Sequence, residues 1–127
     1  MNTTEQRTEV ATLLAISEIK GARVINFQNQ DVGEVDELLI EPDTGQMRFA
    51  VVSVGGFLGL GSTRVAVPWQ ALQITGENGR VRYVLDATKE RLEKAPRVEG
   101  KNYERLYPAD VSQPIFLYWD VRWMEEP

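Results

Sequence analysis

Two of the most reactive side chains are missing from this 127-residue chain, which contains no cysteine and no histidine. Without cysteine, the protein can form neither disulfide bonds nor thiolate metal sites. Without histidine, it lacks the commonest general base and the commonest neutral metal ligand. We therefore predict no catalytic residues, no metal site and no cofactor.

Long apolar runs and an excess of positive charge are also missing. No apolar run reaches the roughly 18 to 20 residues that a membrane-spanning helix needs, so no membrane span is expected. The 14 lysines and arginines are outnumbered by 19 aspartates and glutamates, which gives a net charge of −5. Because nucleic-acid binding draws much of its affinity from basic side chains, this charge opposes a nucleic-acid partner.

The N-terminal segment shows none of the features of a secretory signal. Residues 1–16 lack a basic start, a long apolar stretch and a cleavage site. We interpret them as a flexible leader and expect the protein to be cytoplasmic.

Apolar residues make up 43% of the chain, which is enough for the core of one domain, and much of the pattern has the two-residue period of strands. A proline-to-glycine turn at 42–45 and the Asn78–Gly79 pair predict hairpins. The second strand keeps its phase only with a bulge near Asp36 and Glu37. The third strand is apolar on both faces, so we expect it to be central. The expected strands cover residues 23–27, 33–41, 46–54 and 64–69, a short fifth strand around Leu72 and Ile74, and residues 81–86.

Two helical segments and one tryptophan complete the predicted domain. Ser17 is expected to cap a single helical turn, and Thr88 a short helix that Pro96 terminates. Alternation places Trp69 in the fourth strand, on the core face beside Val65. Six short strands joined by turns, followed by one short helix, predict an all-β fold closed into a small barrel.

The glycine-rich segment between the third and fourth strands is close to a phosphate-binding loop. Residues 56–63 read GFLGLGST, and Ser62 occupies the position of the lysine that such a loop needs. The residues that follow have the period of a strand and not of a helix. We therefore interpret the segment as a crossover between strands. Its apolar residues are candidate interaction residues: Phe57, Leu58 and Leu60.

Acidic residues gather in the second strand and its flanking turns, where oxygen ligands could bind calcium or magnesium. Their spacing fits no loop motif, and successive strand residues point to opposite faces. We favour a solvated acidic edge that discourages aggregation between strands. The residues are Asp31, Glu34, Asp36, Glu37, Glu41 and Asp43.

The C-terminal extension, residues 97–127, is rich in aromatic residues. Tyr103, Leu106 and Tyr107 are candidate anchors, and Ser112 is expected to cap a helix with Pro114 in its first turn. A strand is the alternative, because aromatic and β-branched residues dominate. The extension either covers its own barrel or packs on a second subunit, and both interpretations stay open. Its candidate interaction residues are Phe116, Trp119 and Trp123.

Four short features follow one another along residues 19–86: Gly33 followed by Val35, the hairpin through Asp43 and Gly45, the Gly55–Gly56 pair, and the Val67–Pro68–Trp69 triplet. In these features residues 19–86 resemble the PRC-barrel family. The resemblance implies a PRC-type barrel at residues 17–96. It also implies an adaptor or assembly role, in which the barrel pairs with itself or docks onto a larger complex.

The predicted function is a non-enzymatic PRC-barrel assembly or interaction module, present as a homodimer in the bacterial cytoplasm, with an unknown protein partner. One alternative is a barrel that senses a small ligand or an ion. Another is an adaptor for ribosome maturation that contacts a ribosomal protein rather than RNA.

Overall fold

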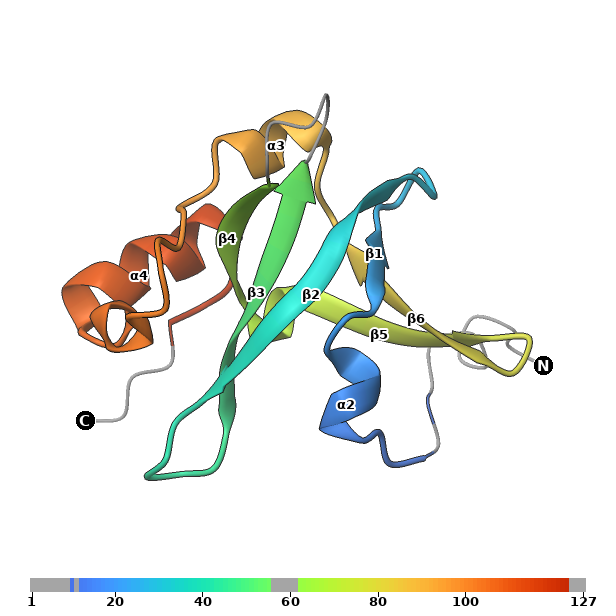
Figure 1. The fold of residues 1–127 in the computed structure, drawn as a ribbon, viewed down its shortest axis with the longest axis horizontal. Helices are drawn as coiled ribbons and strands as arrows, with labels where there is room; N and C mark the ends of the chain where they lie inside the picture. Colours follow the sequence, from blue (N-terminus) through green and yellow to red (C-terminus); the bar gives the residue numbers. More distant parts are fainter. Residues whose placement is uncertain (1–9, 11, 56–61, 124–127) are drawn as a thin grey trace.

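The computed structural model describes residues 10, 12–55 and 62–123, and within them six strands form one twisted sheet in the order β4-β3-β2-β1-β6-β5 (Figure 1). The strands are β1 (Arg23–Ile25), β2 (Asp31–Ile40), β3 (Met47–Gly55), β4 (Ser62–Pro68), β5 (Leu72–Glu77) and β6 (Arg80–Leu85). The helices are α2 (Ile16–Ile19), α3 (Lys89–Glu93), α4 (Ala109–Tyr118) and the 3₁₀ helices η2 (Trp69–Ala71) and η3 (Tyr103–Leu106).

The predicted hairpins and the bulge are confirmed. β2 pairs antiparallel with β3, and the register shifts between Val35 and Glu37, so that Asp36 is the extra residue. Gly45 at the first hairpin has a φ of 75°, which glycine adopts without strain. Asn78 and Gly79 both have positive φ and join β5 to β6. Strands β1 and β6, which are distant in the sequence, pair in parallel and connect the two hairpins.

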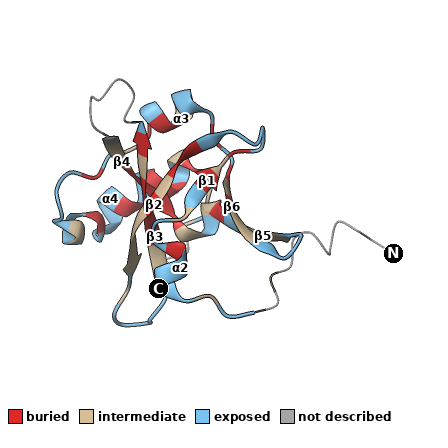
Figure 2. Ribbon diagram, turned by 45° about the vertical axis from the view of Figure 1, so that its right-hand side comes forward, coloured by how far each residue is buried: buried red, intermediate tan, exposed pale blue. Residues whose placement is uncertain are grey.

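Strand β3 is central, as predicted, and is covered on both faces. Its residues Phe49 to Val52 are all buried. Because neighbouring strand residues point to opposite faces, consecutive buried residues require a layer on each side of the strand. The curled sheet supplies one layer, and the ring of Phe116 from α4 packs edge-on against Phe49 to supply the other. The buried residues gather around β2, β3 and β4 (Figure 2).

The predicted closure into a barrel is not found in the described residues, since the outermost strands β4 and β5 do not pair with each other. The outer edge of β4 bonds to the chain beyond α3 instead. Pro96 accepts a hydrogen bond from Ala66 N–H at 3.1 Å, and Val98 N–H donates to the Arg64 carbonyl at 2.8 Å. The sheet is therefore open, with this edge covered by the C-terminal extension.

Thr88 caps α3 as predicted, whereas the expected start of α2 is wrong. The Thr88 hydroxyl accepts from Arg91 N–H at 3.0 Å. Helix α2 begins one residue before Ser17, because the Glu18 carboxylate reaches back to Ala15 N–H at 2.8 Å and caps the turn.

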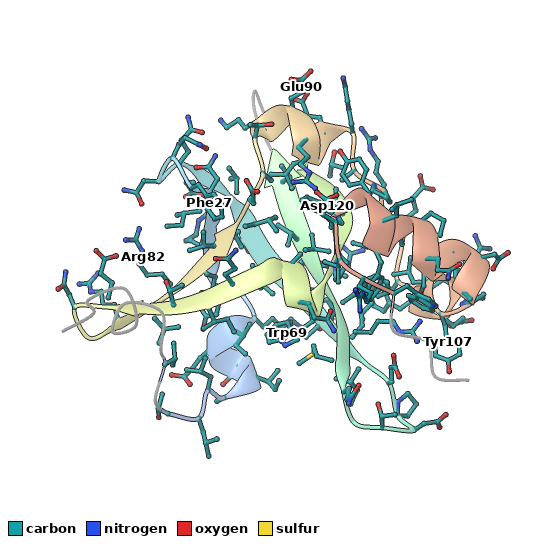
Figure 3. All side chains as sticks on the ribbon, turned by 180° about the vertical axis from the view of Figure 1, so that it is seen from behind. Phe27, Trp69, Arg82, Glu90, Tyr107 and Asp120 are labelled. Atoms are coloured by element: carbon teal, nitrogen blue, oxygen red, sulfur yellow. The ribbon has the colours of Figure 1, made fainter. Side chains whose placement is uncertain are left out.

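Two strand ends also differ from the expectation. β1 stops at Ile25, because the side-chain Oδ1 of the buried Asn26 accepts from the backbone N–H groups of Gln28 and Gln30 and forms a tight loop. Trp69 does not belong to β4. Pro68 ends the strand, and Trp69 begins η2, where it is only partly buried against the core (Figure 3).

A Gly33→Ala variant tests how closely β2 and β3 approach each other. A Cβ atom at Gly33 would lie 2.5 Å from the backbone oxygen of Ser53, which cannot rotate away. We expect the free energy of unfolding to fall by roughly 1 to 3 kcal/mol, as in other overpacked sites. Urea denaturation measures the loss. The open position Gly79→Ala, strained only through its φ of 78°, is the comparison and is expected to cost about 1 kcal/mol. A Gly33→Ala variant as stable as the wild type would show that the strands can separate.

Candidate functional site

The structure places the predicted interaction residues of the extension on the protein's own sheet. Phe116 and Trp119 lie on the inner face of α4 and are only 6% and 5% exposed. The Trp119 indole N–H donates to the Ala66 carbonyl at 3.0 Å, on the outer edge of β4. Trp123 is partly buried, with its ring edge-on to Phe116 at a centroid distance of 5.0 Å. Phe116 and Trp119 therefore have little area left for a partner. The other candidates, Phe57, Leu58 and Leu60, lie outside the described residues.

The expected helix in the extension is present, but its start is not at Ser112. Helix α4 begins at Ala109, and Ser112 is buried in its second turn. The Ser112 hydroxyl donates to the backbone oxygen of Leu106 and so ties α4 to η3. Pro108 precedes the helix as its N-cap, since proline fixes the extended conformation that precedes a first turn.

Arg48 of β3 is the first of three arginines that hold the extension. Its guanidinium bonds to Glu41 at 2.6 Å, to the Tyr107 carbonyl at 3.1 Å and to the Ser112 hydroxyl at 2.9 Å. It also lies 4.8 Å from the ring centroid of Tyr107 and 5.1 Å from that of Trp123. Planar guanidinium groups stack on aromatic rings while they donate in their own plane. Arg48 thus fixes both ends of α4 against the β2–β3 hairpin.

Arg64 of β4 holds the segment before η3. It donates to Asp36, the bulged residue of β2, at 2.8 Å and to the Gly100 carbonyl at 2.6 Å, and it bonds to the Tyr103 hydroxyl. Partial burial opposes its charge, but the hydrogen bonds to Tyr103 and Asp36 outweigh it and raise the pKa of Arg64.

Arg91 of α3 holds the C-terminal end of α4. It donates to the carbonyls of Asp86 and Tyr118, both at 2.8 Å, and to the Asp120 carboxylate at 3.2 Å. The Tyr118 hydroxyl returns a hydrogen bond of 2.5 Å to the Arg91 carbonyl. The guanidinium carbon also lies 4.7 Å from the ring centroid of Trp119. The sequence gives no signal for the three arginines, since arginine in an amphipathic strand or helix normally faces solvent.

The junction between the β2–β3 hairpin and the extension leaves an apolar groove of about 630 Å³. Phe49 and Leu106 are buried at its base. Leu38 forms part of the wall, and Ile40 from the hairpin and Tyr107 from the extension, each 56% exposed, form its rims. Tyr107 lies at the outer side of the extension in Figure 3. We call these residues the hairpin groove. Tyr107 and Leu106 were anchor candidates in the sequence, whereas nothing in the pattern singled out Leu38 or Ile40.

The charged groups of the hairpin groove are mostly acidic. Glu41 is neutralised by Arg48, and both side chains are largely buried. Asp43 and Glu104 also line the groove, and neither forms an ion pair within the described part of the chain. The groove therefore combines an apolar base with two negative charges.

The acidic residues of β2 are paired with basic side chains, and the predicted acidic edge is wrong because β2 lies between β1 and β3. Arg23 bonds to Asp31 at 2.6 Å and to Glu34 at 2.9 Å. The hydrogen bond from Arg23 lowers the pKa of Asp31, and the same bond raises the pKa of Arg23. Among the residues that the structure describes, no three acidic groups are placed to hold a metal ion. The cation-binding alternative thus has no preformed site in this region.

The family is decided by comparison with known protein families. The family model of the PRC-barrel domain matches residues 11–92, more than half of the chain. The chain belongs to the PRC-barrel family. The match includes β1 to β6 and most of α3, whereas η3 and α4 lie beyond it. No curated protein matches this PRC-barrel chain. In the described segments, none of the helices has the length and apolar character to cross a membrane.

An Arg48→Met variant tests whether the arginine holds the extension in place. Methionine keeps an apolar stem but leaves Glu41 without its cation. Removing one partner of a buried ion pair costs about 3 to 5 kcal/mol, and because this pair is partly exposed we expect a loss of about 2 kcal/mol. Lys94→Met, which breaks the exposed Lys94–Glu90 pair, is the control and should cost less than about 0.5 kcal/mol. Equal losses in chemical denaturation would contradict a structural role for Arg48.

Proposed function

We propose that this PRC-barrel protein is a non-enzymatic interaction module whose hairpin groove binds an apolar segment of a partner protein. The exposure of Ile40 and Tyr107 on the two rims carries the proposal. Exposed apolar side chains that converge on one hollow are typical of protein interaction sites. The buried Phe49 and Leu106 at the base continue this apolar surface inward.

The hydrogen bonds that join the two walls of the groove favour binding without a large ordering cost. Its two walls come from different parts of the chain, and Arg48 bonds to both of them, through Glu41 on the hairpin and the Tyr107 carbonyl on the extension. A preorganised site loses less conformational entropy on association. The arrangement suits a partner that inserts one or two apolar side chains between the rims.

Charge complementarity favours a basic partner segment. Asp43 and Glu104 would attract lysine or arginine that flanks the inserted apolar residues. A basic ribosomal protein, as in the adaptor hypothesis, has this chemistry, and so do many other proteins. The homodimer and the cytoplasmic location stay predictions, and neither is needed for this binding mode.

A small-ligand sensor is the second candidate, and the size of the groove favours it. Small-molecule sites usually enclose about 300 to 1,000 Å³ with mostly apolar walls, and the hairpin groove of about 630 Å³ falls in this range. A ligand in the groove would raise the melting temperature of the protein, because it stabilises the folded state by an amount that grows with the logarithm of its concentration relative to its dissociation constant.

An Ile40→Glu variant tests the interaction module. Proteins co-purified with the tagged full-length chain from its native cells are quantified for wild type, Ile40→Glu and the control Leu13→Glu. Leu13 is 94% exposed and lies outside the groove, so its replacement makes the same change of charge. We expect Ile40→Glu to lose a specific partner that Leu13→Glu retains, and to weaken binding of the purified partner at least about 10-fold, or 1.4 kcal/mol.

Two results would contradict the proposal or redirect it. A partner retained equally by both variants would show that binding occurs elsewhere on the protein. A small molecule that raises the melting temperature of the wild type but not of Ile40→Glu, with no partner lost, would favour the sensor.

A further inference from the structure

Helix α4 has a second, outward face that its packing on the sheet leaves uncovered. Its inner face buries Ser112, Ile115, Phe116 and Trp119. On the outer face Pro114 and Leu117 follow one another at helical spacing, and Leu117 is 76% exposed. A leucine side chain this exposed, in the last turn of α4, buries little apolar surface within its own subunit.

The outer face is hollowed as well as apolar. Pro114, Leu117, Val121 and Trp123 line a depression of about 470 Å³ beside α4. Val121 and Trp123 are brought back to the helix because Val121 N–H bonds to the Phe116 carbonyl at 2.9 Å and Asp120 N–H to the Leu117 carbonyl at 3.1 Å. These two bonds are those of a Schellman motif, with Asp120 at the left-handed position, where φ is 61°. The result is a projecting Leu117 next to a hollow able to receive a leucine.

The charges at the two ends of this face are opposite. Asp110 lies in the first turn of α4, and Arg122 follows its C-terminal end. Both are exposed, and within the described residues neither takes part in an ion pair. If two such faces meet in antiparallel orientation, each Asp110 lies opposite the Arg122 of the other copy. A parallel arrangement would instead place like charges together.

We propose that α4 pairs antiparallel with α4 of a second copy of this chain, through the outer face from Asp110 to Arg122. Leu117, near the middle of this face, lies close to the two-fold axis and enters the hollow of the other copy. In such an isologous contact every interaction occurs twice, so the two charge pairs form together. The antiparallel helix dipoles also attract one another. The surface is separate from the hairpin groove, and the proposal does not depend on the proposed function.

The proposal changes which residues of the extension mediate dimerisation. The sequence indicated Phe116, Trp119 and Trp123 as interaction residues. Phe116 and Trp119 hold α4 to its own sheet, and the dimer uses Leu117 and Pro114 from the opposite face, with Trp123 at the side of the hollow.

Sedimentation of the full-length chain tests the surface. We expect a dimer at about 100 µM that dissociates on dilution, and a Leu117→Glu variant whose dissociation constant is raised more than about 10-fold. The control Ile16→Glu, at a 53% exposed position on α2, should leave the dimer unchanged. Circular dichroism should show equal folding of all three, because both side chains are exposed. A monomeric wild type at this concentration, or a Leu117→Glu variant that remains a dimer, overturns the proposal.

A charge exchange tests the antiparallel orientation. Asp110→Arg and Arg122→Asp should each weaken the dimer, because each places like charges opposite one another twice. The double variant Asp110→Arg/Arg122→Asp restores opposite charges and should recover most of the wild-type affinity. If the losses of dimer affinity in the two single variants instead add up in the double variant, the antiparallel pairing is overturned.

Disulfide formation gives an independent measurement. Since the chain contains no cysteine, Leu117→Cys introduces a single thiol, which is close to its counterpart if Leu117 lies near the two-fold axis. We expect Leu117→Cys to form a covalent dimer on mild oxidation at low protein concentration, and Ile16→Cys to stay monomeric. Equal cross-linking of the two variants would contradict the proposal.

Discussion

The outer edge of β4 is the constraint on which the arrangement of the C-terminal extension depends. A strand edge exposes backbone donors and acceptors that either bond to water, invite aggregation or pair with another segment. Here Ala66 N–H, the Arg64 carbonyl and the Ala66 carbonyl bond in turn to Pro96, Val98 and the indole of Trp119. The bonds to Pro96 and Val98 extend the sheet by a single antiparallel bridge between Val65 and Arg97. The bond to Trp119 satisfies the Ala66 carbonyl with a side-chain donor instead of a backbone N–H.

This edge determines where α4 lies. Since Trp119 must reach the Ala66 carbonyl, the helix is fixed beside β4, and its neighbour Phe116 then falls against Phe49. Three arginines, one each from β3, β4 and α3, hold the extension in this position through hydrogen bonds to its backbone carbonyls. Each contacts a carboxylate, a backbone carbonyl and an aromatic ring. One guanidinium can bind all three because its N–H donors lie in its own plane while its face stacks on the aromatic ring. The hairpin groove is the space left where Arg48 joins the two parts.

The sequence predicted the individual strands and turns of the PRC-barrel domain better than the order in which the strands pair in the sheet. The bulge at Asp36 followed from a break in a two-residue period, and the Asn78–Gly79 turn from backbone sterics, both of which are local. The parallel pairing of β1 with β6 has no local signal. Because the strand order was unknown, the carboxylates of β2 were interpreted as an edge although β2 is interior. Trp69 was misplaced because alternation cannot show that Pro68 ends the strand.

For the candidate interaction residues, composition predicted that they would bury apolar surface. It did not predict whether each contact would be made within the chain or with another molecule. The clustered aromatics of the extension indicated a large contact, and Phe116 and Trp119 make it within the chain. The groove rims Ile40 and Tyr107 are single apolar residues in separate segments, and only the fold brings them to one hollow.

The two faces of α4 differ in what the packing of the extension on the sheet requires of them. Covering the β4 edge requires the inner residues alone, and polar side chains at the outer positions would make the helix more soluble without loss of packing. Leu117 and Pro114 nevertheless lie outward beside a hollow, between an unpaired acid and an unpaired base in the described part of the chain. One helix can thus use its inner face for the fold and its outer face for assembly. Because the inner face is held by Trp119 and Arg91, the outer face is presented in a fixed orientation, which lowers the entropy lost when a second copy binds.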